Sequence, residues 1–463
     1  MKVALVWPYG FDGKYVLPIS LAYLKSNVDN ARHKVKVIDC AFLGIKSSSG
    51  EFRRILRRFN PDVVGVSSWS ITYEEAAEVL RTAKEIKRKT ITVMGGVHST
   101  TYCDGVMRNG FIDFVLRGEA ELSFPRFLEE AVKKKPDWSK VGGLVYRSKD
   151  AVKKNEIILS EDLDVIRLPD YDAINLDGYI RSGYRFNTPH KMNAPVWVTR
   201  GCPYRCAFCA ATLLNGPVVR AHSIEYMIKW VKHLYRKGIR HISIIDDNFT
   251  YDVDYAKRFC KAMIRLNLEG LHFGTPNGIR AQRSDPELFR LMKEAGWEYV
   301  VVAPESGSLK TLKRMRKNIR PDTFPPVVAQ IRKAGLKAHG FFIVGYPGET
   351  VDDIQATVRL LRMCRLNFFF LNNFQPLPGT PVYEELIKNG ELMEGQLPKD
   401  YSSGERAYVP AKLKGYNFPS LILKEYLRLL LSDPMNIPYV IEMVGLRMMF
   451  TKVASNLKNM LHA

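Results

Sequence analysis

Two series of short apolar runs, separated by amphipathic stretches, fill most of this 463-residue chain and limit the folds open to it. In the first series, residues 1–135, strands are predicted at Val3–Trp7, Lys34–Asp39, Val63–Ser67, Thr90–Met94 and Ile112–Leu116. Helices are predicted at Ser20–Ser26, Phe52–Phe59 and Tyr73–Lys87, and from Phe124 onward. Nearly all-apolar strands that alternate with helices are typical of a parallel sheet covered on both faces. We therefore expect a doubly wound, Rossmann-like α/β domain with its ligand crevice at the carboxyl ends of the strands.

The second series, residues 191–385, also alternates predicted strands and helices. Its predicted strands are Val196–Thr199, His241–Ile245, Leu271–Gly274, Tyr299–Ala303, Ala338–Val344 and Phe368–Phe374, with helices such as Pro286–Ala295 and Phe324–Ala334 between them. A run of six strand–helix units predicts a partial (β/α)6 barrel. The chemistry of such a barrel is expected at the carboxyl ends of its strands.

Two segments interrupt this pattern. Residues 136–190 are charged and contain Leu168-Pro169-Asp170-Tyr171-Asp172, which predicts a linker laid over a surface. Residues 386–463 form a helical C-terminal region, in which apolar clusters alternate with basic residues from Phe418 onward. We expect a helical cap that packs its apolar face on the barrel. The alternative is peripheral binding to an anionic membrane, because no uncharged apolar run is long enough to span one.

Composition places the chain among globular proteins, with 46% hydrophobic and 25% charged residues. Seven cysteines, three of them within eight residues, do not resemble a disulfide framework and suit a reducing compartment. No secretory signal is recognisable at the N-terminus, so a cytoplasmic location is expected. The net charge of +21 is compatible with nucleic acid, an anionic membrane or an acidic substrate, or with a generally basic surface, because the basic residues are spread along the chain.

The three clustered cysteines, Cys202, Cys206 and Cys209, directly follow the first predicted strand of the second series. Three thiolates on a tight loop can each bind one iron of a [4Fe–4S] cluster and leave the fourth iron open. Arg200 and Arg205 are expected to offset the charge of such a cluster. A structural zinc site is the alternative, but zinc requires four ligands. The other cysteines stand alone, and His190 and His222 have no ligand-like partner spacing.

The Cys-x3-Cys-x2-Cys loop after a first barrel strand resembles that of the radical S-adenosylmethionine (SAM) superfamily. The resemblance implies that the open iron chelates SAM and that one electron, from an external flavodoxin or ferredoxin type of reductant, makes a 5′-deoxyadenosyl radical. It also implies a set of SAM contacts on the later strand ends. These are Asp246, Asp247 and Asn248 for the amino group, Arg280 for the carboxylate, Glu305 and Ser306 for the methionine or ribose, and Gly345 and Phe208 for the adenine.

Three N-terminal segments, Asp62–Ser68, Met94–His98 and Arg117–Glu119, resemble those of the cobalamin-binding domains of B12-dependent radical SAM enzymes. Small residues are needed where the nucleotide tail of cobalamin slides between strand ends. The resemblance implies cobalamin contacts from Ser67, Ser68, Gly95, Gly96, Gly118 and Glu119, with His98 as a hydrogen-bonding loop residue near the tail. The Asp-x-His-x-x-Gly motif of other cobalamin enzymes is missing; Asp12-Gly13-Lys14 and Asp39-Cys40-Ala41 are the nearest fragments. We therefore expect no protein histidine on cobalt.

These features together predict a B12-dependent radical SAM enzyme that acts on a small-molecule or lipid-like substrate. Methylation of an unactivated carbon through methylcobalamin is the expected outcome, and cyclisation or rearrangement needs the same machinery. A cobalamin-independent, RNA-modifying radical SAM enzyme is less favoured, because the methylthiotransferases of that kind carry three further N-terminal cysteines. A non-enzymatic iron–sulfur carrier or metal-stabilised binding protein is also less favoured, since a carrier normally supplies a fourth cysteine.

Overall fold

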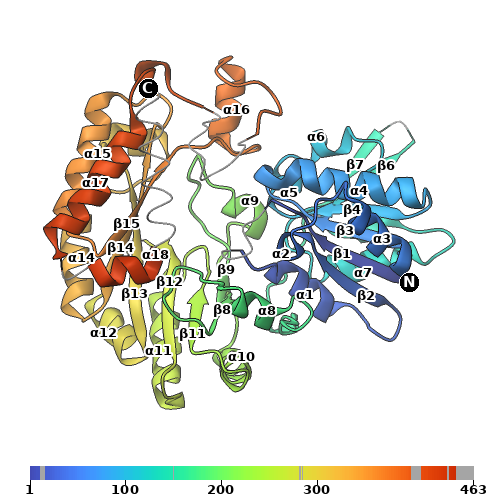
Figure 1. The fold of residues 1–463 in the computed structure, drawn as a ribbon, viewed down its shortest axis with the longest axis horizontal. Helices are drawn as coiled ribbons and strands as arrows, with labels where there is room; N and C mark the ends of the chain where they lie inside the picture. The colour runs from blue at the N-terminus through green and yellow to red at the C-terminus, as the bar shows by residue number, and fades with distance from the viewer. Residues whose placement is uncertain are drawn as a thin grey trace.

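Two α/β units lie side by side in the structure, a computed structural model that describes residues 1–10, 16–149, 151–280, 283, 285–397, 408–434 and 437–444. Figure 1 shows the N-terminal unit, in blue and cyan, beside a second unit coloured green to red. One sheet has seven strands and another has six, and a two-stranded ribbon follows the first strand of the six-stranded sheet in the sequence. The expected α/β class, with a doubly wound domain ahead of a partial barrel, is confirmed.

The N-terminal sheet has the strand order β2-β1-β3-β4-β5-β6-β7. Its parallel strands are β1 (Lys2–Trp7), β2 (Lys34–Asp39), β3 (Val63–Ser67), β4 (Ile91–Gly95) and β5 (Phe114–Leu116). The helices are α1 (Ile19–Asn27), α2 (Cys40–Leu43), α3 (Gly50–Phe59), α4 (Tyr73–Ile86), α5 (Val97–Thr101), α6 (Cys103–Met107) and α7 (Ser123–Ala131). Leu5 and Trp7 of β1 pack in one core with α1 and α7, whereas Val6 packs in a second core with α3 and α4. This alternation explains why the strands are apolar on both faces.

The structure differs from the linker expected over residues 136–190. Strands β6 (Leu144–Ser148) and β7 (Ala151–Lys154) extend the N-terminal sheet in antiparallel pairing. Farther along, Tyr171, Tyr179 and Tyr184 are fully buried beside α8 (Leu176–Arg181). The charged composition hid this packing because β7 is an exposed edge strand, where lysines are common. The buried tyrosines are isolated in the sequence and produce no periodic pattern.

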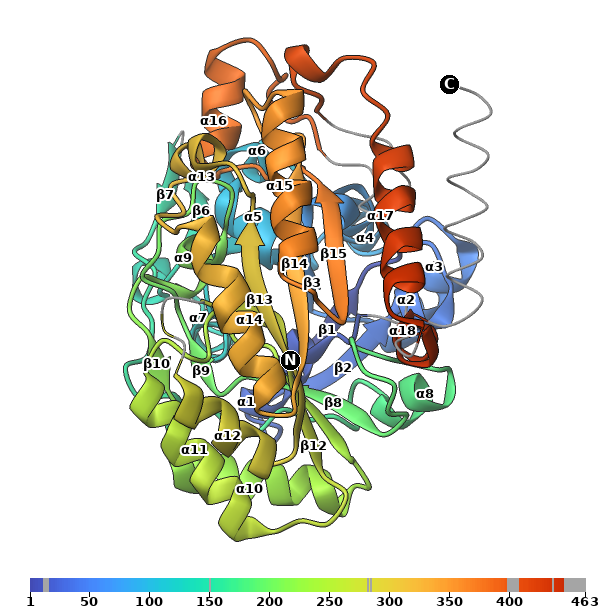
Figure 2. The same ribbon diagram turned by 90° about the vertical axis from the view of Figure 1, so that its left-hand side faces the viewer.

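The second sheet is parallel throughout, with the order β15-β14-β13-β12-β11-β8. Its strands are β8 (Asn193–Val196), β11 (His241–Ile244), β12 (His272–Ile279), β13 (Trp297–Glu305), β14 (Lys337–Val344) and β15 (Phe368–Asn373). The outer helices are α10 (Ile224–Arg236), α11 (Val253–Leu266), α12 (Pro286–Glu294), α13 (Leu309–Arg314), α14 (Phe324–Lys333) and α15 (Val351–Met363). Figure 2 shows α11, α12, α14 and α15 along the outer face of this sheet. The six predicted barrel strands are therefore all present.

The first barrel strand ends earlier than the sequence predicts. β8 stops at Val196, and the next residues turn away from the sheet. The backbone N–H groups of Val198 and Thr199 donate to the two carboxylate oxygens of Asp246, at 2.7 and 2.8 Å, instead of to a neighbouring strand. The Asp246 side chain thus redirects the chain toward the cysteine loop.

The described part of the C-terminal region packs on the edge of the barrel. It comprises α16 (Pro381–Lys388), α17 (Phe418–Ser432) and α18 (Ile437–Val444). On α17, the ring of Tyr426 stacks on Phe369 of β15 at 4.8 Å between centroids, and buried Glu425 forms an ion pair with Arg362 of α15. No helix within the described residues is long and apolar enough to cross a membrane. The apolar run at Leu457–Leu461 and the fragment Asp12–Lys14 lie outside the described residues.

Buried ion pairs join the two units. Arg200 and Arg220 lie opposite each other on the antiparallel ribbon of β9 (Thr199–Arg200) and β10 (Arg220–Ala221). The guanidinium of Arg200 lies 2.7 Å from the Glu121 carboxylate and 3.6 Å from Glu119, and Arg220 donates to Glu119 at 3.0 Å. Both glutamates follow β5 of the N-terminal sheet. The Arg200 side chain is only 4% exposed, so this ion-pair network is shielded from solvent.

We expect Glu121→Gln to destabilise the cofactor-free protein by about 3 kcal/mol, because it leaves the Arg200 charge buried without its nearest partner. The free energy of unfolding is measured by urea titration with tryptophan fluorescence. Glu129→Gln is the matched control, since Glu129 pairs with Arg126 while both side chains are more than 40% exposed, and its effect is expected to stay below about 1 kcal/mol. Equal effects of the two substitutions would show that the Glu121 pair does not join the units.

Candidate functional site

The three cysteines of the motif lie on the loop between β9 and α9 (Ala211–Asn215). Cys202, Cys206 and Cys209 are free thiols with partial solvent access, whereas the other cysteines, Cys40, Cys103, Cys260 and Cys364, are buried elsewhere. Burial raises the pKa of all three loop thiols, that of Cys209 to about 12. Metal binding replaces the thiol proton, so a metal group that takes three thiolates suits this loop.

Backbone contacts hold the cysteine loop in place from three sides. Gly201 has a φ of +94°, and a Cβ atom there would lie 2.2 Å from the carbonyl oxygen of Val218, so only glycine fits at the start of the loop. In the middle of the loop, the N–H of Ala207 donates to the carbonyl of Met315 at 2.9 Å. The carbonyl of Ala207 accepts from the N–H of Val382 at 3.1 Å. These backbone contacts fix the position of the loop relative to the barrel.

Two cations lie beside the cysteine loop. Arg280, from the end of β12, stacks 3.4 Å from the ring centroid of Tyr204 and donates to the carbonyl of Lys317 at 2.7 Å. The Lys317 ammonium forms a 2.7 Å ion pair with Glu305 and lies 5.9 Å from the ring centroid of Phe208. Arg280 and Lys317 both act to lower the pKa of Cys206 against the larger effect of burial. They supply positive charge where an anionic cluster would bind.

Arg200 does not fill the charge-balancing role expected for it. Its side chain turns toward the N-terminal unit, where it pairs with Glu121 and lies over the rings of Tyr23 and Trp197. Arg205 is exposed on the loop. The sequence suggested Arg200 because it is close to Cys202 along the chain, and side-chain direction is not visible at that level.

The predicted SAM contacts at the end of β11 play different structural roles. Both oxygens of Asp246 are engaged by the backbone at residues 198 and 199, and full burial raises its pKa to about 7. Asp247 accepts a 2.7 Å hydrogen bond from the side-chain amide of Asn215. Asn248 is buried, and its side-chain oxygen has no hydrogen-bond partner among the described residues. Asn248 is therefore the member of this trio with an acceptor left for a ligand.

The SAM contacts predicted at the ends of β13 and β14 also differ in their structural roles. Glu305 ends β13 in a left-handed conformation, φ +62°, and pairs with Lys317 beside the cysteine loop. Ser306 turns inward to Thr357, 3.0 Å between hydroxyl oxygens. The N–H of Gly345 donates to buried Glu349 at 2.7 Å. Polar groups of Asp247, Arg280 and Glu305 thus meet near the cysteines, whereas Ser306 and Gly345 shape the turns behind them.

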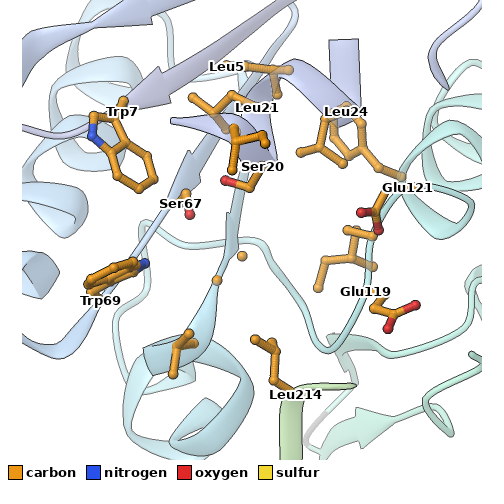
Figure 3. Close-up of a pocket in the computed structure, with 18 of the residues that line it drawn as sticks. Leu5, Trp7, Ser20, Leu21, Leu24, Ser67, Trp69, Glu119, Glu121 and Leu214 are labelled. Atoms are coloured by element: carbon orange, nitrogen blue, oxygen red, sulfur yellow. The ribbon is translucent and has the colours of Figure 1, made fainter. Parts of the chain in front are cut away.

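A cavity opens at the carboxyl end of the N-terminal sheet and reaches the barrel (Figure 3). Its walls from the N-terminal unit include Leu5, Trp7, Gly65, Ser67, Trp69 and Val93, and those from the second unit include Pro195, Trp197, Leu214, Asn215 and Ile245. Figure 3 shows Trp7 and Trp69 on one side of the cavity and Glu119 and Glu121 on the other. Most of the lining is aliphatic or aromatic, and no histidine is among the lining residues that the structure describes.

Most of the predicted cobalamin contacts line this cavity, namely Ser67, Gly95, Gly96, Gly118 and Glu119. Gly96 has a φ of +95°, and a Cβ there would lie 2.7 Å from the backbone of Ser68. Ser68 and His98 lie behind the cavity wall. The His98 ring packs 4.4 Å from Tyr73, its Nδ1 lies 3.1 Å from the Ser70 hydroxyl, and burial lowers its pKa to about 4. His98 is therefore a neutral core residue at neutral pH.

Several cavity residues were missed by the sequence analysis. Trp7 and Trp69 form an edge-to-face pair, 6.4 Å between centroids, and Trp197 of the second unit also lines the cavity. Tyr184 and Phe186 come from the segment expected to be a linker. The available signal for Trp7 and Trp69 was their place at predicted strand ends, since Trp7 is the last residue of one predicted strand and Trp69 lies two residues after another. No local signal marks Tyr184, because tertiary folding alone brings it to the cavity.

Known families match both halves of this arrangement. The family model of the radical SAM superfamily matches residues 196–361, and that of the B12 binding domain matches residues 13–128. An uncharacterised methyltransferase of Pyrococcus horikoshii is 32% identical over 379 residues, which cover 81% of this chain and 80% of that protein. The chain belongs to the cobalamin-dependent radical SAM enzymes.

A further relative and two solved structures are also similar to this chain. The cytidylyl-2-hydroxyethylphosphonate methyltransferase of Streptomyces wedmorensis is 26% identical over 422 residues, 81% of this chain and 78% of that protein. The radical SAM methyltransferase TsrM of Kitasatospora setae, solved with cobalamin and a [4Fe–4S] cluster, superposes with a TM-score of 0.70 at 18% identity and covers 84% of this chain and 75% of its own. The cobalamin-dependent radical enzyme OxsB superposes with a TM-score of 0.67 at 19% identity. The superposition covers 88% of this chain and 58% of the OxsB chain. At these identities the two superpositions establish the fold.

The residues present fit the cofactors of this radical SAM enzyme. Three accessible thiols with no fourth cysteine beside them suit a [4Fe–4S] cluster with one open iron. The free acceptor of Asn248 and the charges of Arg280 and Glu305 suit the amino acid end of SAM. The cavity suits cobalamin, because it lies at the carboxyl ends of parallel strands and small residues, Gly65, Gly95, Gly96 and Gly118, line it.

We expect Gly65→Val to weaken cobalamin binding at least about tenfold while the domain still folds. Gly65 lies in the middle of β3, and a Cβ there would be 3.2 Å from Leu5 and would extend into the cavity. Valine is favoured in strands, so the sheet should tolerate it. Absorbance titration of anaerobic protein with hydroxocobalamin measures the change.

Gly110→Val is the matched control, because Gly110 is exposed and a Cβ there would contact nothing within 4 Å. Cobalamin affinity and circular dichroism should match those of the unaltered protein. Unchanged cobalamin binding by Gly65→Val would place the cofactor outside this cavity.

Proposed function

We propose that this enzyme methylates an unactivated carbon of a small-molecule substrate, with cobalamin as methyl carrier. The observation that carries the proposal is helix α9, which connects the two cofactor sites. It begins two residues after Cys209, and its last residues, Leu214 and Asn215, line the cavity of the N-terminal unit. Asn215 also donates to Asp247 beside the cysteines. One short helix therefore sets the spacing between cluster and cobalamin.

The cofactors supply a 5′-deoxyadenosyl radical and a transferable methyl group when bound. The chain itself holds and orients them, which is the main contribution that proteins make to cofactor chemistry. The cysteine loop is anchored through Gly201 and Ala207, and Arg280 and Lys317 place positive charge beside it. Trp7, Trp69 and Trp197 contribute aromatic walls to the cavity of the N-terminal unit.

The relatives support methylation in particular. The Pyrococcus and Streptomyces proteins are both named as methyltransferases, and each aligns with about four-fifths of this chain. RNA modification by a cobalamin-independent enzyme is less well supported. The N-terminal cysteines available for a further metal site in that class, Cys40 and Cys103, are both buried in the core that contains α3 and α4.

Two partners belong to the proposal. A flavodoxin or ferredoxin type of protein would supply the single electron that the cluster needs. A lipid-like substrate is supported by α17, which packs one face on the barrel while Leu427 and Leu431 are 47% and 80% exposed. Flotation with anionic liposomes, comparing the full chain with one that ends before Phe418, tests the membrane contact. Loss of flotation in the shorter chain is the expected result, and equal behaviour would remove this part of the proposal.

The main test is anaerobic reconstitution with iron, sulfide and hydroxocobalamin. The unaltered protein should bind about four irons per chain, and Cys202→Ala/Cys206→Ala/Cys209→Ala should lose them while retaining cobalamin. Cys364→Ala, which alters a buried barrel cysteine away from the loop, is the control and should keep its iron. Zinc in place of iron would contradict the radical mechanism.

Methyl transfer from SAM to cobalamin can be measured in a separate experiment. With dithionite and SAM carrying a deuterated methyl group, mass spectrometry should detect S-adenosylhomocysteine and deuterated methylcobalamin without any added substrate. Release of 5′-deoxyadenosine alone, with cobalamin left unmethylated, would favour cyclisation or rearrangement over methylation.

A further inference from the structure

A group of histidines and one glutamate gathers at the end of the barrel opposite the cysteine loop. His241 and His272 are the first residues of β11 and β12, Glu298 is the second residue of β13, and His190 lies just before β8. The four strands are neighbours in the sheet order β13-β12-β11-β8, and His241 pairs with His272 in the register of β11 and β12. We call these four residues the histidine cluster. None of them contributes to the cofactor sites described above.

The potential ligand atoms of the histidine cluster are close together. The Nε2 atom of His190 lies 2.8 Å from Oε1 of Glu298, and the Nδ1 atom of His272 lies 3.6 Å from the same oxygen. The ligand atoms of His190, His272 and Glu298 all lie within 4.8 Å of one another. Distances of this order place three donors around one point.

A second observation is that two buried polar atoms of the histidine cluster lack hydrogen-bond partners among the described residues. His241 is fully buried, and its Nε2 atom lies 3.7 Å from Oε2 of Glu298, too far for a hydrogen bond. Neither this nitrogen nor this oxygen has a hydrogen-bond partner among the described residues, although both atoms are buried. Unpaired buried polar atoms are costly, so they usually mark a bound ion, a water or a functional site.

The donor set indicates the kind of ligand. Two imidazole nitrogens and one carboxylate oxygen are the protein ligands of many zinc sites, and imidazole is also favoured by other late divalent transition metals. The side chains of His190, Glu298 and His272 are 27%, 28% and 36% exposed, so an ion can enter from solvent and keep a water ligand. Buried His241 lies behind Glu298, and its Nδ1 is 3.5 Å from the Ser243 hydroxyl.

We propose that His190, His272 and Glu298 bind a divalent transition-metal ion of the zinc type, with the buried His241 imidazole beside the Glu298 carboxylate. The ion would tie together the starts of β8, β12 and β13. Because barrel chemistry takes place at the opposite strand ends, the role of this site is structural.

The test uses metal-free protein with Cys202→Ala/Cys206→Ala/Cys209→Ala, so that the cysteine loop cannot bind the added ion. Titration with Zn²⁺ against a chromophoric chelator should reveal one tight site per chain. Added Co²⁺ should give the visible absorption of a tetrahedral or five-coordinate complex. Zn²⁺ should also raise the thermal midpoint, because an ion that binds only the folded state stabilises it.

His272→Gln and Glu298→Gln should each weaken Zn²⁺ binding at least tenfold and abolish the thermal shift. His272 is partly exposed, so His272→Gln should fold, as circular dichroism without metal can verify. His233→Ala is the matched control, because His233 lies on α10 outside the cluster and should leave both readouts unchanged. Absence of a stoichiometric site, or binding that these variants do not alter, would overturn the proposal and leave a histidine–carboxylate ion pair in its place.

Discussion

The arrangement of both cofactor sites depends on the buried ion pairs of Arg200 and Arg220 with Glu119 and Glu121. Arg200 comes immediately before the Gly201-Cys202 turn, and the two glutamates lie on the wall of the cavity of the N-terminal unit. A shift of this contact would move the cysteine loop and the cavity relative to each other. Buried charges tolerate little displacement, because a charge that loses its partner in a low-dielectric setting is strongly penalised. The contact therefore acts as a geometric constraint as well as a link between the units.

A second constraint comes from Asp246. Its carboxylate, which the family resemblance assigns to SAM, instead receives the backbone N–H groups of Val198 and Thr199. This contact ends the first barrel strand early and sends the chain across to the N-terminal unit as β9. The cysteine loop thus begins between the two units, at the place where a substrate must meet both cofactors. Positioning of this kind is how a protein contributes most to radical chemistry that its cofactors supply.

The carboxyl and amino ends of the barrel strands carry different groups of residues. The carboxyl ends of the strands carry the cysteine loop, Asn248, Arg280 and Glu305, as expected for a barrel of this class. The amino ends carry the histidine cluster, where Glu298 and His241 each have a buried atom without a hydrogen-bond partner in the part of the chain that the structure describes. A metal ion there would brace the first strands of an open barrel, which lack the closure that stabilises a complete one. The cofactor sites and the stabilising metal site would then lie at opposite ends of the barrel strands.

The sequence alone determined the fold class, all six barrel strands, the five parallel strands of the first domain and the three cysteines. These features are local, since apolar runs and closely spaced cysteines leave a pattern that no distant residue alters. Only the tertiary structure decided the inward turn of Arg200, the engagement of Asp246, the burial of His98 and the contribution of Tyr184 to the cavity. It also brought His190 next to Glu298, 108 residues later in the chain. Parallel strands place residues side by side whose separation in sequence is set by the intervening helices, so no spacing rule could have revealed that pairing.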